Sequence, residues 1–287
     1  MRPKIGLVLG GGGSRGVAHI GVLKVFAREN IPIDLIVGTS MGGIIGTLYA
    51  LDYSPDRIGE HMLQNMKGSN LLNMNIFSAR ARQNSVQEQL KGAIAEKTFA
   101  DLKIPVTLMA VDMRHGKEIL LNEGKLMPAV LATTAVPGVF PPVAMDDMLL
   151  ADGGVIDSLA THVAYEQGAD IVIAVDVYPE LEKDNPWIDP VAAITGIELP
   201  FGSFSFTNDW ERIPSALASI WRSTRVMTWY LHEQRLEAHP PHVLLHPDVD
   251  KFSSMDFKDM MGPMMAGLAE AENHLDEIRA LVNASAA

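Results

Sequence analysis

A single serine between glycines, in the stretch Ile36–Gly43 (IVGTSMGG), is well suited to act as a nucleophile. The spacing Gly38-x-Ser40-x-Gly42 is typical of a nucleophile elbow, a sharp turn between a strand and a helix. A side chain at position 38 or 42 would crowd such a turn, so glycine suits both positions. The Ser40 hydroxyl would stand above a helix N-terminus, whose unpaired N–H groups favour developing negative charge. An ordinary Gly-rich turn is the alternative, because this short pattern often arises by chance.

A second glycine-rich stretch, Gly10–Gly16 (GGGGSRG), follows the apolar run Ile5–Leu9, which we predict to be the first strand. Its spacing Gly11-x-Gly13-x-x-Gly16 is that of a dinucleotide-binding loop. Such a loop requires an acidic residue at the end of the second strand, whereas the segment DLIVGTS has its only acid at its start. The glycines have another use, because consecutive small residues can point backbone N–H groups at an oxyanion, as in lipases.

A third motif, Asp152-Gly153-Gly154, ends a predicted hairpin strand and would by itself be a common tight turn. The base that activates Ser40 could instead be one of nine histidines. In an α/β-hydrolase several strands precede the elbow, whereas here only one strand and one helix do. We expect His19 to be packed inside the first helix. The sequence gives no reason to choose among the remaining clustered candidates, His232, His239, His242 and His246.

Strands and helices alternate along the first part of the chain, which favours an α/β fold with a mostly parallel sheet. The segment Asp170–Val177 is a continuous apolar run, typical of a central parallel strand. Towards the C-terminus we predict a long helix over Glu211–Glu237 and a closing helix over Phe257–Val282. Methionines of the closing helix are expected in the core, with lipid binding as the alternative: Met260, Met261, Met264 and Met265.

The composition is that of a soluble globular protein, with 47% hydrophobic and 20% charged residues among 287. A net charge of −12 without a basic cluster argues against a nucleic-acid partner. The absence of cysteine excludes disulfides and thiolate metal sites. The first apolar stretch is too short for a signal peptide, and no run approaches the length of a membrane span. We therefore expect a cytoplasmic protein.

Taken together and in this order, the three motifs resemble those of the patatin-like phospholipases. Gly11–Gly16 matches the family's oxyanion motif, Gly38–Gly42 its nucleophile motif and Asp152–Gly154 its aspartate motif. The stretches RGVAHIGVLKVF and TTAVPGVFPPV are also similar to bacterial members of the family. The resemblance is strong over residues 5–180 and weak over the remainder. Each motif alone is unspecific, whereas three in order are specific.

The resemblance implies a three-layer α/β/α sandwich and hydrolysis of lipid acyl esters by a Ser–Asp dyad without histidine. Ser40 would be the nucleophile and Asp152 the proton acceptor, and no metal or cofactor is implied. The oxyanion hole would be formed by Gly11, Gly12 and Gly13. Support for these motifs would come from Arg15 as an anchor of the glycine loop, and from Gly16, Gly38, Gly42, Gly153 and Gly154.

Two departures from the family pattern bear on the pocket and on substrate specificity. Asp157-Ser158 stands where Asn-Pro is common, and Thr134 stands where serine is frequent. A general carboxylesterase, an acyltransferase and a regulatory scaffold with little turnover are the alternative functions. We expect one domain, with a catalytic core over residues 1–180 and a cap with C-terminal helices over 181–287. The aromatic, Pro-rich stretch 179–209 would form either a mobile cap that meets lipid at the membrane surface or a contact within a homodimer.

Overall fold

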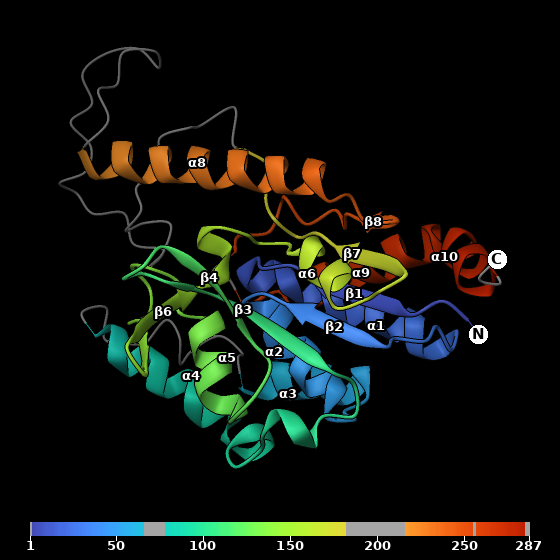
Figure 1. The fold of residues 1–287 in the computed structure, drawn as a ribbon, viewed down its shortest axis with the longest axis horizontal. Helices are drawn as coiled ribbons and strands as arrows, with labels where there is room; N and C mark the ends of the chain where they lie inside the picture. The colour runs from blue at the N-terminus through green and yellow to red at the C-terminus, as the bar shows by residue number, and fades with distance from the viewer. Residues whose placement is uncertain (1, 66–77, 182–215, 255–256, 285–287) are drawn as a thin grey trace.

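A computed structural model describes residues 2–65, 78–181, 216–254 and 257–284 of the chain. Its centre is an eight-stranded mixed sheet with the strand order β5-β6-β3-β2-β1-β7-β8, and β4 pairs with β3 (Figure 1). The neighbouring strands β3, β2, β1, β7 and β8 are parallel, which confirms the mostly parallel sheet expected from the sequence. The strands are β1 (Ile5–Leu9), β2 (Leu35–Gly38), β3 (Val106–Asp112), β4 (Lys117–Leu121), β5 (Val143–Met145), β6 (Met148–Asp152), β7 (Ile171–Val175) and β8 (Val243–Leu245).

Helices cover both faces of the sheet (Figure 1). Alternate residues of a strand point to opposite faces, so Leu7 and Leu9 of β1 join a core with α1, α2 and α9, while Val8 joins a second core with α6. The helices are α1 (Ala18–Arg28), α2 (Met41–Ala50), α3 (Pro55–Asn65), α4 (Ala79–Ile94), α5 (Leu126–Thr133), α6 (Thr161–Glu166), α8 (Ala216–Ala238), α9 (Met261–Asn273) and α10 (Leu275–Asn283). Short 3-10 turns are η1 (Gly13–Val17), η2 (Phe99–Asp101) and η3 (Gly153–Val155).

The closing helix differs from the sequence prediction in two ways. It consists of α9 and α10, which meet at His274. Met260 and Met264 are buried, but Met261 and Met265 are both 52% exposed, so the prediction that all four pack in the core is wrong for these two. Residues four apart share one face of a helix, whereas adjacent residues point in different directions. Of the predicted cap over residues 179–209, the structure describes only 179–181, so the cap stays a prediction.

Two strands run towards each other along one edge of β3. The parallel strand β2 pairs with the first half of β3 and ends with Gly38 opposite Leu108. The antiparallel strand β6 pairs with the second half and ends with Asp152 opposite Ala110. The other edge of β3 is occupied by β4 from Leu108 to Asp112. The pairing therefore brings the residues that follow β2 close to the end of β6.

The helices α1 and α9 approach so closely that glycine is required at their crossing. A Cβ atom on Gly267 of α9 would lie 2.0 Å from the carbonyl oxygen of Ala18, and a Cβ atom on Gly21 of α1 would lie 2.0 Å from that of Met264. Real atoms cannot approach so closely, so a methyl group at either position would force the two helices apart. The contact therefore fixes the C-terminal helix against the helix that follows the glycine loop.

We expect Gly267→Ala to lower the free energy of unfolding by about 2–3 kcal/mol, because it separates two packed helices. Gly92→Ala on α4 is the matched control, since a Cβ atom there has no neighbour within 4 Å. This control should stabilise the protein by about 0.5–1 kcal/mol, as expected for alanine in place of glycine in a helix. Urea unfolding followed by circular dichroism measures both changes. Equal stabilities of the two variants would contradict the close crossing.

Candidate active site

The side chains of Ser40 and Asp152 meet where β2 and β6 end. The Ser40 side chain favours the ionised form of the Asp152 carboxyl through hydrogen bonding, which lowers the pKa of Asp152, and both side chains are buried. Ser40 has φ 54° and ψ −121°, in the left-handed half of backbone space that residues with a Cβ atom rarely adopt. Strained backbone of this kind is held only where the surroundings determine it, and such positions cluster at active sites.

Close packing and one hydrogen bond hold this turn. A Cβ atom on Gly42, in the first turn of α2, would lie 2.1 Å from the carbonyl oxygen of Leu9, so the elbow rests directly on the end of β1. The backbone N–H of Ser40 donates to the hydroxyl oxygen of Thr133 over 3.0 Å. Thr133 is fully buried at the end of α5. The turn is therefore fixed from two sides, which leaves the serine hydroxyl directed at Asp152.

Asp152 lies in an environment that makes its carboxylate more basic. Burial raises its pKa to about 6, although hydrogen bonds from the Ser40 hydroxyl and the Gly154 N–H favour the ionised form. The Gly154 N–H donates over 2.8 Å to the Asp152 carboxylate, so the chain turns at Gly153-Gly154 and its backbone caps the preceding Asp152 side chain. An aspartate with a pKa near 6 can accept a proton from a hydroxyl far better than an exposed one.

The glycine loop passes beside Ser40. A Cβ atom on Gly11 would lie 3.3 Å from the Cβ atom of Ser40, so this part of the loop packs against Ser40. The Gly11 N–H is already bonded to the Ser158 carbonyl oxygen, at 3.0 Å. Within the described part of the chain, the N–H groups of Gly12, Gly13 and Met41 have no hydrogen-bond partner. Of the three glycines predicted to form an oxyanion hole, two therefore retain a free donor.

Two neighbours hold the glycine loop in place. The Arg15 guanidinium donates to the carbonyl oxygens of Phe252 and Asp250, at 2.6 and 3.2 Å, and the Ser14 hydroxyl donates to that of Ser253. On the inner side, the His19 ring nitrogen Nε2 lies 2.8 Å from the Gly10 carbonyl oxygen. Burial lowers the pKa of His19 to about 4, so its ring is neutral at neutral pH and acts as a donor here.

The buried histidines nearest this sheet edge do not bond to the serine. His19 is fully buried, and its second ring nitrogen has no hydrogen-bond partner. His232 bonds through Nε2 to the carboxylate of Asp176, at 2.9 Å, and its Nδ1 is buried without a partner. Burial would raise the pKa of Asp176, but hydrogen bonds from His232 and His246 outweigh it and keep this carboxyl ionised. Asp176 and His232 thus form a separate buried pair after β7.

The structure brings in two residues whose role at the site was not predicted. Thr133 contacts the elbow, whereas the hydroxyl of Thr134, singled out in the sequence, bonds within its own helix to the carbonyl oxygen of Val130. Ser158 contacts Gly11 through both its carbonyl oxygen and its hydroxyl. The departure Asp157-Ser158 marked this segment in the sequence, but nothing in the sequence indicated its partner.

Apolar side chains extend along α2 away from Ser40. A narrow gap between α2, α4 and α5, with no room for a water molecule, is lined by Ile44, Thr47, Leu48, Leu90, Ile94 and Val130. The helix that follows Ser40 therefore packs against apolar side chains on this side. None of the described helices is both long and apolar enough to cross a membrane.

Comparisons with known proteins give the family and the fold. The sequence model of the patatin-like phospholipase family matches residues 7–165. Patatin-like phospholipase domain-containing protein 6 of Mus musculus is 30% identical over 283 residues, covering 88% of this chain and 19% of that protein. Lysophospholipase NTE1 of Yarrowia lipolytica is 27% identical over 286 residues, covering 96% of this chain and 20% of that protein. The chain thus spans about a fifth of the length of these relatives. Human GIVD cytosolic phospholipase A2, 9% identical, has the same fold, with a TM-score of 0.52 over 98% of this chain and 63% of that one.

The raised pKa of Asp152 predicts that its charge weakens the folded state. Its pKa is 3.8 when unperturbed and about 6 in the folded protein. The free-energy cost of burying the ionised carboxylate is therefore small below about pH 4 and complete above about pH 6. We expect Asp152→Asn, which keeps the shape, to raise the free energy of unfolding by about 2 kcal/mol at about pH 7 and much less at about pH 4. The exposed Glu123→Gln is the control and should change neither value. Urea unfolding measures this; an Asp152→Asn variant less stable than wild type at both pH values would contradict the prediction.

Proposed function

The chain belongs to the patatin-like phospholipase family, and on this premise we propose that it is a carboxylic ester hydrolase acting on phospholipids or lysophospholipids. Ser40 is the proposed nucleophile and Asp152 the proposed general base. The observation that carries the proposal is the hydrogen bond from the Ser40 hydroxyl, on a strained elbow, to a buried carboxylate whose pKa is about 6. A nucleophile bonded directly to its base is the arrangement that hydroxyl activation requires.

The reaction proceeds in two halves. Ser40 Oγ attacks the ester carbonyl carbon while its proton moves to Asp152, and the tetrahedral intermediate collapses when that proton passes to the departing alcohol oxygen. Water then attacks the acyl–serine ester, again giving its proton to Asp152. Collapse of the second intermediate releases the fatty acid and returns the proton to Ser40 Oγ. Asp152 thus begins and ends the cycle ionised, so its pKa near 6 suits work at neutral pH.

Backbone N–H groups would stabilise the oxyanion of each intermediate. Among the described residues, the donors without a partner are those of Gly12 and Gly13, which follow Gly11 in the glycine loop, and of Met41 at the start of α2. Each donor lost from such a hole costs about 3–4 kcal/mol of transition-state stabilisation. Gly11 is better regarded as a support for the loop, since its N–H is bonded to Ser158.

The substrate class is supported by the relatives. The Yarrowia relative is named a lysophospholipase, and the human structural relative is a phospholipase A2.

The nucleophile is tested by Ser40→Ala. We expect loss of fluorophosphonate labelling and a fall in release of fatty acid from lysophospholipid of at least about 10³-fold, with the fold unchanged by circular dichroism. Ser223→Ala on the exposed face of α8 is the matched control and should keep full activity. For wild type, kcat/KM should rise as pH passes about 6, where Asp152 ionises. Labelling of the Ser40→Ala protein to the wild-type extent would exclude Ser40 as the nucleophile.

The absence of a catalytic histidine is tested at His232, His239, His242 and His246. Each single alanine variant that folds should retain activity within about tenfold of wild type. His232→Gln is tested together with His232→Ala, because the glutamine side chain can still donate a hydrogen bond to the buried Asp176 carboxylate. A folded histidine variant as inactive as Ser40→Ala would show that the enzyme uses a Ser–His–Asp triad instead of the dyad.

A further inference from the structure

The pair Asp157-Ser158, which departs from the family pattern, lies buried behind the glycine loop. Asp157 is 2% exposed and Ser158 is 3% exposed. Leaving an ionised carboxylate inside a protein is costly unless cations or hydrogen-bond donors compensate for the lost water. Whatever surrounds Asp157 must therefore supply that compensation.

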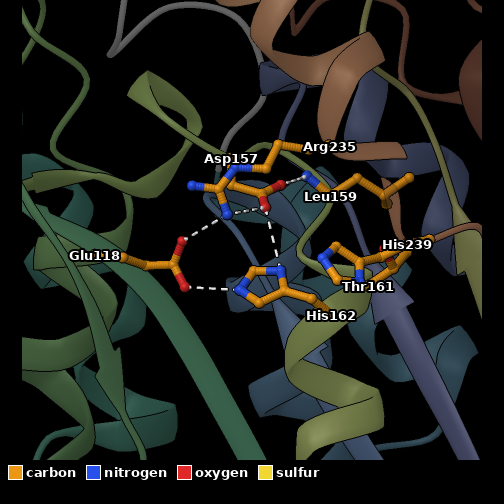
Figure 2. A network of polar contacts seen from close by, with 7 residues as sticks. All are labelled: Glu118, Asp157, Leu159, Thr161, His162, Arg235 and His239. Atoms are coloured by element: carbon orange, nitrogen blue, oxygen red, sulfur yellow. Dashed lines mark hydrogen bonds and ion pairs between the residues drawn. The ribbon is translucent and has the colours of Figure 1, made fainter. Parts of the chain in front are cut away.

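Two elements supply cationic partners for Asp157, and β4 supplies a second carboxylate, Glu118, for the same cations (Figure 2). His162 of α6 has Nδ1 3.4 Å from Asp157 Oδ2 and Nε2 2.8 Å from Glu118 Oε1 on β4. One guanidinium nitrogen of Arg235 on α8 lies 3.5 Å from Asp157 Oδ2 and 3.3 Å from Glu118 Oε2. We call Glu118, Asp157, His162 and Arg235 the charge cluster. Its two cations each stand between the same two carboxylates.

The charges of this cluster balance only when His162 is protonated. Hydrogen bonding to Glu118 and the negative charges of Glu118 and Asp157 raise the pKa of His162, although burial and Arg235 oppose the rise. Burial raises the pKa of Asp157, against the effects of His162, the Leu159 N–H and Arg235. The ring of His239, after α8, faces His162 with 5.6 Å between centroids. With His162 charged, two positive groups match two negative ones.

Asp157 connects this cluster to the glycine loop through the next residue. Asp157 Oδ1 accepts a hydrogen bond of 3.0 Å from the Leu159 N–H, which fixes the turn that presents Ser158. Ser158 accepts from the Gly11 N–H through its carbonyl oxygen and donates its hydroxyl to the Gly11 carbonyl oxygen, at 3.0 and 3.1 Å. Gly11 in turn packs against Ser40.

We propose that the charge cluster is a positioning device for the proposed active site, which holds the glycine loop beside Ser40 through Ser158 and does so only while His162 carries its proton. The proposal rests on the proposed function for its catalytic consequence. When pH rises through the raised pKa of His162, the ring becomes neutral and Arg235 alone faces two carboxylates. The buried turn at Asp157 then carries an uncompensated negative charge. As a result, the hydrogen bonds between Ser158 and Gly11 weaken.

The same three acidic and imidazole side chains could instead hold a divalent cation. One ligand atom from each of Glu118, Asp157 and His162 lies within 4.8 Å of the others, and Asp157 Oδ2 is buried without a hydrogen-bond partner. The position of Arg235 favours the charge-balanced cluster, because a guanidinium within 3.5 Å of two ligands would repel a cation. The two possibilities give different results when the charge of Asp157 is removed.

Asp157→Asn separates charge from shape. Its amide oxygen still accepts from Leu159, while Glu118 and Arg235 balance each other whether or not His162 is charged. We expect kcat/KM of wild type to fall about tenfold between about pH 7 and about pH 9, and that of Asp157→Asn to fall less than about twofold. Asp146→Asn in the exposed β5–β6 turn, where φ is 53° and asparagine fits, is the matched control and should keep the wild-type profile. The same alkaline fall in Asp157→Asn and wild type would overturn the proposal.

Hydrogen exchange of the Gly11 amide tests the device without any substrate. After correction for the intrinsic effect of pH, protection of this amide should drop at least about threefold in wild type over the same pH range and stay constant in Asp157→Asn. Ser158→Ala should lower the protection at both pH values, because it removes the hydroxyl bond to Gly11. If no ester is hydrolysed, the proposed function fails while this measurement still decides the present proposal. Protection that is independent of pH in wild type would refute it.

Calorimetric titration with Zn²⁺ alone completes the test. We expect no binding step in wild type that Asp157→Asn lacks, because the Arg235 guanidinium beside both carboxylates repels a second cation. A Zn²⁺ site present in wild type and abolished by Asp157→Asn would replace the charge-balanced cluster by a metal site and overturn the proposal.

Discussion

The site depends on the meeting of two strands on one edge of β3. β2 arrives in parallel and β6 arrives antiparallel, and they end opposite Leu108 and Ala110. A sheet with only parallel strands would leave the ends of neighbouring strands side by side, with no second chain running towards the first. The hairpin that turns β6 around is therefore what places Asp152 in front of the residue that follows β2. The backbone pairing of β2 and β6 with β3 therefore brings the residue after β2 close to Asp152, independently of side-chain contacts.

Burial at this junction has a cost that the surrounding structure must offset. The Asp152 carboxylate loses most of its water, and two hydrogen bonds, from Ser40 and Gly154, only partly compensate. Ser40 holds a backbone conformation that is strained for a residue with a Cβ atom. Packing of the first turn of α2 on the end of β1 and the hydrogen bond to Thr133 hold it there. Destabilised groups held by a rigid frame are typical of sites where stability is traded for activity.

Two buried aspartates five positions apart show how surroundings assign different roles. Asp152 is bonded to an uncharged hydroxyl and an amide, so its proton affinity rises into the range useful for catalysis at neutral pH. Asp157 faces His162 and Arg235, and its charge is balanced. The first is the proposed general base, whereas the second faces charged side chains of α6 and α8. Ser158, directly after Asp157, links this segment to the glycine loop.

The sequence alone determined the elements and their order, because glycine spacing and apolar periodicity depend on neighbours along the chain. The strand before Gly10, the elbow at Ser40 and the mostly parallel sheet follow from such local patterns. Which hydroxyl supports the elbow was decided by tertiary structure: Thr133 points at Ser40, and its neighbour Thr134 points back into its own helix. The engagement of the Gly11 N–H by Ser158 and the assembly of the charge cluster from separate elements were decided in the same way. These contacts join residues up to 147 positions apart, and only the packing of helices on the sheet brings them within hydrogen-bond distance.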